Sequence, residues 1–146
     1  MKVEYNNLYT HFIFTTIFRM PVIAEVNRKR IEKYVSGICR NNDCRIYSIY
    51  ANPEHMHFLV SRTPEISECL LANIVANGSE KFIHENHLVQ GPFKWQDSCS
   101  AFSVSKSDVD RVCQYIFNQP NHHQKFSFAE EYDRFIRFYQ RTISLK

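Results

Sequence analysis

Glycine, long apolar runs and paired cysteine motifs are all scarce in this chain of 146 residues. Only three glycines occur, and no loop of the G-x-x-x-x-G-K type is present, so chemistry driven by bound ATP or GTP is not expected. No apolar run approaches the ~20 residues that span a bilayer, and residues 1–7 contain no apolar segment typical of a secretory signal. We therefore expect a cytoplasmic protein with no membrane partner and no nucleotide cofactor.

The cysteines also lack a pattern. There are five of them, without Cys-x-x-Cys spacing, which fits free and mostly buried thiols in a reducing compartment; Cys99, in a polar stretch, is the one expected to be exposed. The net charge of +3 permits a polyanionic partner without requiring one. With 44% apolar and 23% charged residues the chain is typical of a globular protein, and we expect a single domain over residues 1–146.

The spacing of apolar residues predicts alternating strands and helices. The expected strands cover residues 8–18, 44–51, 55–60 and 101–104, and the expected helices cover about 22–41, 66–86, 109–119 and 128–141. A break is expected at residues 118–123. Gly78, inside the second helix, is interpreted as a mark of close packing, and the apolar anchors expected in the last helix are Phe135, Ile136, Phe138 and Tyr139.

The order of these elements predicts an α+β fold. Strand, helix, strand, strand, helix and strand form the split arrangement of a ferredoxin-like antiparallel sheet, followed by further helices at the C-terminal end. In that arrangement helices cover one face of the sheet. We expect the other face to be free for a ligand or for single-stranded nucleic acid.

Two histidines on the third predicted strand are candidate metal ligands. Because side chains alternate along a strand, His55, His57 and Leu59 are expected on one face, while Met56, Phe58 and Val60 form an apolar stripe on the other. Two neutral imidazoles side by side provide half of a divalent-metal site. The alternative is that each histidine only hydrogen-bonds a neighbour at the edge of the core.

Tyr115 stands out on the third predicted helix. The apolar stripe of this helix contains Val109, Val112, Cys113, Ile116 and Phe117. With a rotation of ~100° per residue, Tyr115 lies roughly 130° from the centre of that stripe. Gln119, four residues further on, shares its face. Tyr115 is a candidate hydroxyl nucleophile, and the amide oxygen of Gln119 suits a hard ion such as Mg²⁺ or Mn²⁺. The alternative is a solvated face whose tyrosine covers neighbouring apolar surface.

Several of these stretches together resemble a known family. Residues 54–57 (Glu-His-Met-His) resemble the His-hydrophobic-His motif of the HUH endonucleases. Residues 115–119 (Tyr-Ile-Phe-Asn-Gln), followed by two histidines at 122–123, resemble the signature of the single-tyrosine HUH transposases, which include insertion-sequence and REP-associated tyrosine transposases. Residues 93–96 and 101–105 are similar to the block of this family that contains W-Q and A-F-S-V-S. Residues 15–19 resemble the T-T-K-Y-R block of the same family.

The resemblance implies a set of roles. His55 and His57 would bind a divalent metal, Mg²⁺ or Mn²⁺, with Gln119 completing its protein ligands, and Tyr115 would attack DNA. It also implies a homodimer that acts on single-stranded DNA hairpins at element ends. Cleavage and rejoining during transposition would then proceed through a 5′-phosphotyrosine intermediate.

The chain departs from the family pattern at four places, one of which is its C-terminal stretch, which is generic. Ile17 stands where the family has Lys, and residues 98–100 (Ser-Cys-Ser) replace Gly-Tyr-Gly, so the loop before the last strand is expected to differ. Pro120 disfavours helical geometry at Gln119, the third ligand.

Other functions remain open at this stage. One is a domesticated relative that cleaves chromosomal repeats. Another is a non-catalytic module that binds single-stranded nucleic acid on the sheet, with bases stacked on Phe12, Phe14, Tyr47 and Phe58. A zinc site built from His84 and His87, or from His122 and His123, lacks supporting spacing.

Overall fold

The centre of the molecule is a four-stranded antiparallel sheet. The computed structural model describes residues 1–144, without the side chains of residues 122, 124, 125 and 138–144. The strands are β1 (Tyr9–Thr15), β2 (Arg45–Ala51), β3 (His55–Ser61) and β4 (Ser100–Val104), in the order β2-β3-β1-β4. This is the ferredoxin-like arrangement that the order of elements predicts, so the expected α+β fold class is confirmed.

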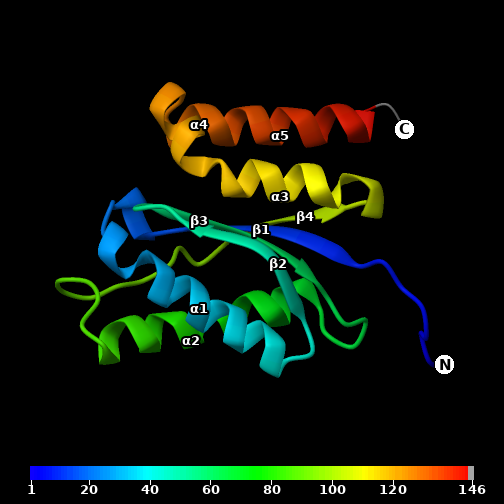
Figure 1. Ribbon diagram of the computed structural model, residues 1–146, viewed down its shortest axis with the longest axis horizontal. Helices are drawn as coiled ribbons and strands as arrows, with labels where there is room; N and C mark the ends of the chain where they lie inside the picture. The colour runs from blue at the N-terminus through cyan, green and yellow to red at the C-terminus, as the bar shows by residue number, and fades with distance from the viewer. Residues whose placement is uncertain (145–146) are drawn as a thin grey trace.

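Helices lie on both sides of this sheet (Figure 1). On one side are α1 (Glu25–Asn41) and α2 (Glu68–Glu85), and on the other are α3 (Val109–Phe117), α4 (Gln119–Lys125) and α5 (Phe128–Ser144). Short 3-10 turns cover Ile17–Arg19 (η1) and Lys106–Asp108 (η2). The expectation of a free sheet face is therefore wrong, because the C-terminal helices fold back over the face that the ferredoxin-like core leaves open.

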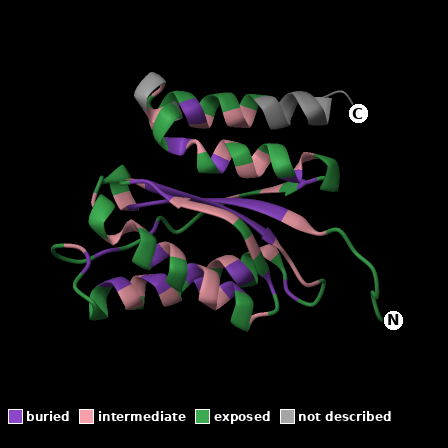
Figure 2. Cartoon of the chain, viewed as in Figure 1, coloured by how far each residue is buried: buried purple, intermediate pink, exposed green. Residues whose placement is uncertain are grey.

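The face toward α1 and α2 carries the main apolar core. Met56, Phe58 and Val60 of β3 are completely buried there, as the alternation of the strand predicts. The ring of Phe58 stacks on Phe12 of β1 with centroids 5.0 Å apart, and Phe14 meets it edge-on at 5.3 Å. Burial of each such side chain contributes about 2–3 kcal/mol. Figure 2 shows the buried residues concentrated along the strands and on the helix faces that meet them.

The opposite face is packed by α3 and α5. Leu59 of β3 and Val104 of β4 form a second, smaller apolar cluster with Val109 and Ile116 of α3. The same face of the sheet carries His55 and His57, because they alternate with Met56 and Phe58. The strand thus divides its side chains between an apolar core and a histidine-bearing face, as predicted.

Element boundaries differ from the predicted ones where side chains redirect the backbone. β1 ends at Thr15 instead of continuing to residue 18, since the Thr16 hydroxyl donates to the carbonyls of Met20 and Glu54 and holds the chain in the turn η1. The break expected at residues 118–123 is confined to Asn118, and α4 begins at Gln119. Pro120 lies in the first turn of α4, where a helix needs no amide donor.

Gly78 marks close packing, as interpreted from the sequence. A Cβ atom at this position would lie 2.8 Å from Cδ1 of Ile38, so the glycine lets α2 approach α1. The described helices include none that is long and apolar enough to cross a membrane.

The cysteines are all free. Cys39 and Cys44 are buried and Cys99 is exposed, as expected, but Cys69 is exposed too, because it lies on the solvent side of the first turn of α2. Phe138 and Tyr139, expected as anchors of the last helix, have side chains outside the described residues.

Candidate active site

Three histidines from two neighbouring strands form the floor of the candidate site. His57 of β3 is paired in register with Ile13 of β1, and His11 of β1 lies diagonal to it on the same face. Nε2 of His11 lies 2.9 Å from Nδ1 of His57, in hydrogen-bonding geometry. His55 has no exposed surface and His57 only 1%, so both imidazoles are shielded from bulk water.

A carboxylate from α5 lies directly against these imidazoles. Oε1 of Glu131 is 3.1 Å from Nε2 of His57, and Oε2 is 3.5 Å from Nε2 of His55. Oε2 also lies 2.6 Å from Nε2 of His123, on α4. Glu131 is itself buried, so its charge is compensated by neighbouring side chains instead of by water.

Tyr115 and Gln119 reach the same carboxylate. The Tyr115 hydroxyl donates a hydrogen bond to Oε1 of Glu131, and Nε2 of Gln119 donates to the same oxygen at 3.0 Å. The ring of Tyr115 meets that of His57 edge-on, with centroids 5.8 Å apart. The amide oxygen of Gln119 accepts from Nδ2 of Asn52 at 3.1 Å. Tyr115 therefore lies at the histidine pair and not on a solvated face.

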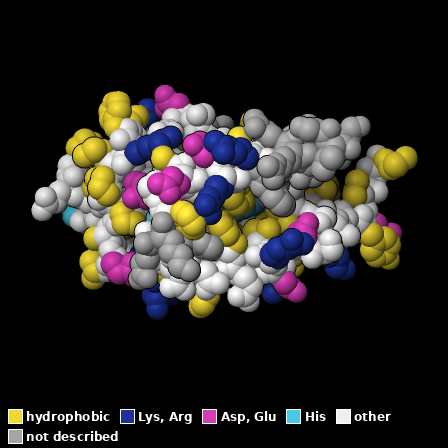
Figure 3. All heavy atoms as spheres, turned by 90° about the horizontal axis from the view of Figure 1, so that it is seen from above, with side chains coloured by type: hydrophobic (Ala, Val, Ile, Leu, Met, Phe, Trp, Pro, Cys, Tyr) yellow, Lys and Arg dark blue, Asp and Glu magenta, His cyan; other side chains and the backbone are white. Residues whose placement is uncertain are grey.

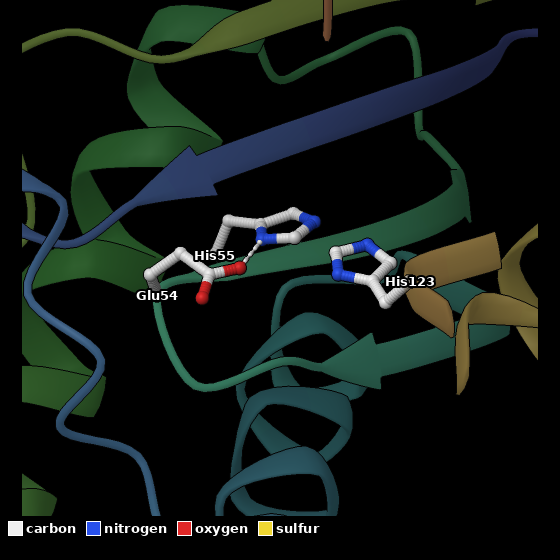
Figure 4. Close-up of side chains that lie close together, drawn as sticks. All are labelled: Glu54, His55 and His123. Carbon is white, nitrogen blue, oxygen red and sulfur yellow. Dashed lines mark hydrogen bonds and ion pairs between the residues drawn. The ribbon is translucent and has the colours of Figure 1, made fainter. Parts of the chain in front are cut away.

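Glu54, His55 and His123 form the outer side of the site (Figure 4). Nδ1 of His55 lies 2.6 Å from Oε1 of Glu54, and the His55 ring stacks on His123 with centroids 4.8 Å apart. Among the side chains that the structure describes, two groupings have ligand atoms within 4.8 Å of one another: Glu54, His55 and His123, and His55, His57 and Glu131. A buried His/Glu group of this kind could hold a metal ion.

Three buried side-chain nitrogens among the described residues have no hydrogen-bond partner, and two of them, Nδ1 of His11 and Nε2 of His57, belong to this site. The one that faces the carboxylate, Nε2 of His57, tests the fit of a metal. Nε2 of His57 is close to Glu131, but the contact lacks hydrogen-bond geometry, so this nitrogen is unsatisfied. With a proton on Nδ1, donated toward His11, the Nε2 lone pair is free to bind a cation. The residues present thus fit a divalent metal.

The protonation equilibria also favour a cation here. Burial lowers the pKa of His57 to about 4 and lowers that of His11 well below its usual value, so both rings are neutral at pH 7. Burial also acts to lower the pKa of His55, but hydrogen bonds with Glu131 and Glu54 outweigh it and raise this pKa. Burial acts to raise the pKa of Glu131, but its close contacts with His123, His55 and His57 hold this pKa well below its usual range. The site therefore presents an ionised carboxylate beside a neutral imidazole.

Two phenyl rings cover the histidines. The ring centroids of Phe128 and His55 lie 3.8 Å apart, and those of Phe135 and His11 lie 4.9 Å apart. Both belong to α5, on the same side as Glu131, because residues three and four apart share a helix face. Figure 3 looks onto this side of the molecule, where little histidine surface is visible among the described atoms.

The structure brings together all four residues singled out in the sequence, His55, His57, Tyr115 and Gln119. The sequence interpretation missed Glu131, Asn52 and His11, and it placed His123 in the transposase signature without giving it a role at this site. Glu131 does carry a signal, since its position between Phe128 and Phe135 places a carboxylate inside an apolar stripe. The base-stacking alternative loses three of its four aromatics, because Phe12, Phe14 and Phe58 are buried under α1 and α2.

Comparisons with known proteins agree with this picture. The family model described as "Transposase IS200 like" matches residues 4–119. A crystal structure of a Deinococcus radiodurans protein assigned as a transposase is 23% identical, covering 82% of this chain and 98% of that one, with a TM-score of 0.64. A REP-associated tyrosine transposase bound to a REP hairpin is 14% identical, covering 84% and 72%, with a TM-score of 0.62. No curated protein matches the chain.

The family model spans most of the chain, including the histidine pair, Tyr115 and Gln119. The chain therefore belongs to the IS200-like transposase family, which confirms the resemblance noted in the sequence. At these identities the two solved structures establish the fold.

Proposed function

We propose that this protein is a metal-dependent transposase that cleaves and rejoins single-stranded DNA through a 5′-phosphotyrosine intermediate. The observation that carries the proposal is that the oxygen of Glu131 that accepts from the Tyr115 hydroxyl lies 3.1 Å from Nε2 of His57, so the phenol and the histidine pair share one site. A phenol, two imidazoles and a carboxamide from Gln119 are the groups that phosphoryl transfer to tyrosine needs. Family membership supports the same reaction class.

The metal ligands we propose are His55, His57 and Gln119. The unsatisfied Nε2 of His57 and the amide oxygen of Gln119 are donors suited to Mg²⁺ or Mn²⁺. When bound, such an ion supplies electrostatic stabilisation of the charge that develops on the scissile phosphate. No nucleotide cofactor is needed, because the phosphotyrosine ester retains much of the free energy of the bond that it replaces.

Tyr115 is the proposed nucleophile. Its hydroxyl oxygen bonds to phosphorus, the bond from phosphorus to the 3′ oxygen breaks, and the proton lost by the phenol is balanced by one taken up at the leaving 3′ oxygen. The products are a 5′-phosphotyrosine and a free 3′-OH, and a second 3′-OH reverses the step to join new ends. The hydrogen bond to Glu131 restricts the phenol to an orientation at the histidine pair, which lowers the entropic cost of attack.

The proposed substrate is a single-stranded DNA hairpin at an element end. One structural relative was solved with a REP hairpin bound, which supports a hairpin ligand for this chain too. In this proposal the protein is a cytoplasmic homodimer of single-domain subunits, and Tyr115 acts in its own subunit or in the partner's. Because Phe128 and Phe135 cover the imidazoles, at least these rings must move aside before a phosphate reaches them.

The test is formation of a covalent protein–DNA adduct. The protein is incubated with Mn²⁺ and single-stranded DNA carrying the element end, and the adduct is detected as a band of reduced mobility on a denaturing gel. We expect Tyr115→Phe to abolish the adduct. The matched control is Tyr132→Phe, which removes a hydroxyl that bonds Ser100 on the same side of the sheet and is expected to leave the adduct unchanged.

Adduct formation by Tyr115→Phe at the wild-type rate would contradict the nucleophile assignment. Adduct formation at the wild-type rate when EDTA is present before the DNA is added would contradict the metal requirement. A domesticated nuclease predicts the same adduct, and it is distinguished by a genomic context that lacks paired element ends with hairpins.

A further inference from the structure

Glu131 is the residue around which the candidate site converges, yet it belongs to no motif. It lies beyond residues 4–119, which the family model matches, and the amino-acid pattern of the motifs does not require it. Its side chain is 6% exposed, in the first turn of α5. A buried carboxylate costs several kcal/mol of desolvation unless its partners compensate, so its placement calls for a specific role.

The carboxylate oxygens are spaced like ligands of one ion. Bonds of about 2.0–2.2 Å to a divalent metal place neighbouring ligand atoms roughly 3 Å apart. Oε1 lies 3.1 Å from Nε2 of His57 and Oε2 lies 3.5 Å from Nε2 of His55. The two imidazoles and the carboxylate have the composition of the 2-His-1-carboxylate sites that hold divalent transition metals.

The same carboxylate also contacts the proposed nucleophile. Oε1, the oxygen nearest to His57, accepts the hydrogen bond of the Tyr115 hydroxyl. Nε2 of Gln119 donates to that oxygen as well and so fixes the orientation of the carboxylate. A purely structural carboxylate would not need to lie against both the unsatisfied nitrogen of His57 and the phenol.

We propose that Glu131 is an additional protein ligand of the metal and also the residue that holds the Tyr115 hydroxyl at a fixed distance from it. This inference rests on the proposed function and adds a carboxylate to His55, His57 and Gln119. A metal with octahedral preference then has two positions left for oxygens of the substrate or water. One side chain of α5 couples the position of the nucleophile to that of the metal.

The first experiment measures Mn²⁺ affinity without DNA, from the electron paramagnetic resonance signal of free Mn²⁺. We expect Glu131→Gln, which keeps the size of the side chain and removes its charge, to weaken Mn²⁺ binding by about tenfold or more. The matched control is Glu130→Gln, an exposed neighbour in the same turn, which is expected to bind Mn²⁺ like the wild type. His57→Ala reports whether binding occurs at this site.

The second experiment separates the two roles of Glu131 by measuring the single-turnover adduct rate over a range of Mn²⁺ concentrations. If Glu131 only bound the metal, saturating Mn²⁺ would restore the wild-type rate to Glu131→Gln. We expect the rate at saturation to remain at least tenfold below that of the wild type, because the phenol has lost its fixed acceptor. Glu131→Asp keeps the charge on a shorter side chain, and we expect smaller losses in both measurements.

The outcomes separate this inference from the proposed function. Mn²⁺ binding that needs His57 but is unchanged in Glu131→Gln overturns the ligand role of Glu131, and a full rate at saturating Mn²⁺ overturns its role on Tyr115; in both cases the proposed function stands. A wild type that neither binds Mn²⁺ nor forms an adduct overturns both proposals. Circular dichroism establishes that each variant is folded, and Glu131→Asp replaces Glu131→Gln if the latter is not.

Discussion

The two faces of the sheet contrast sharply in chemistry although the same strands form them. Toward α1 and α2, β1 and β3 present aromatic and aliphatic side chains that pack into one apolar cluster. Toward α3 and α5, the alternate positions of these strands present His11, His55 and His57, which meet Glu131 and Tyr115. One face is built from contacts that stabilise the fold, and the other holds polar groups together in a buried site.

Neighbouring residues on opposite sides of β3 therefore serve stability and the proposed function separately. A buried cluster of imidazoles and a carboxylate stabilises a fold less efficiently than apolar packing of the same volume. The apolar face must therefore provide the rigidity that keeps the polar face assembled. Substitutions on the apolar face should mainly lower the free energy of unfolding, and substitutions on the polar face should mainly abolish the adduct.

The largest effect on stability is expected from Phe58→Ala. Removal of a fully buried ring that packs on Phe12 and Phe14 should lower the free energy of unfolding by about 3–5 kcal/mol, measured by urea denaturation. Tyr115→Phe removes one hydroxyl, which bonds the ionised Glu131, and should cost about 1.5–3 kcal/mol while it abolishes the adduct. The adduct yield per folded molecule should survive Phe58→Ala at low temperature. A larger loss of stability for Tyr115→Phe than for Phe58→Ala would refute the contrast between the faces.

Thiol reactivity should map the same contrast. Burial, aided by Cys44, raises the pKa of Cys39 to about 12, so this thiol stays protonated and unreactive at pH 8. The exposed Cys69 and Cys99 should be labelled first by a disulfide reagent, half-buried Cys113 more slowly, and Cys39 only on global unfolding. Mass spectrometry of digested protein at timed intervals gives the order. Early labelling of Cys39 would mean that the α1 side of the sheet opens more readily than its packing implies.

The smallest effect is expected at the contact between α1 and α2. Gly78→Ala should gain about 1 kcal/mol of helix propensity, but its Cβ would lie 2.8 Å from Cδ1 of Ile38, so the net change in the free energy of unfolding should be close to zero. Ile38→Val removes that Cδ1 atom. In the Ile38→Val background, Gly78→Ala should therefore stabilise the protein by close to the full ~1 kcal/mol. Equal effects of Gly78→Ala in both backgrounds would show that the two side chains do not interact.

Local patterns predict the fold to a large extent because they act over few residues. Alternation places Phe58 and His57 on opposite faces of β3. Helical spacing was less accurate on α3, because Phe117 of the predicted stripe is 76% exposed and Tyr115 packs against the cluster that contains Val109 and Ile116. The ends of elements were less predictable, since the turn after Thr15 depends on a hydrogen bond from Thr16 to Glu54 in another part of the chain. The covering of the histidine face by α3 and α5 was not predicted, because ferredoxin-like topology alone does not say where additional helices pack.

The apolar stripe of β3, the histidine pair and the family to which the chain belongs follow from the sequence, because spacing along one strand and a run of ordered motifs are local properties. Only the tertiary structure decided that Glu131, His11 and Asn52 join these residues. Those contacts link side chains far apart in the chain, and a charged residue in the first turn of a helix is usually solvated. Only packing of α5 across the sheet makes Glu131 a buried partner of His57 and Tyr115.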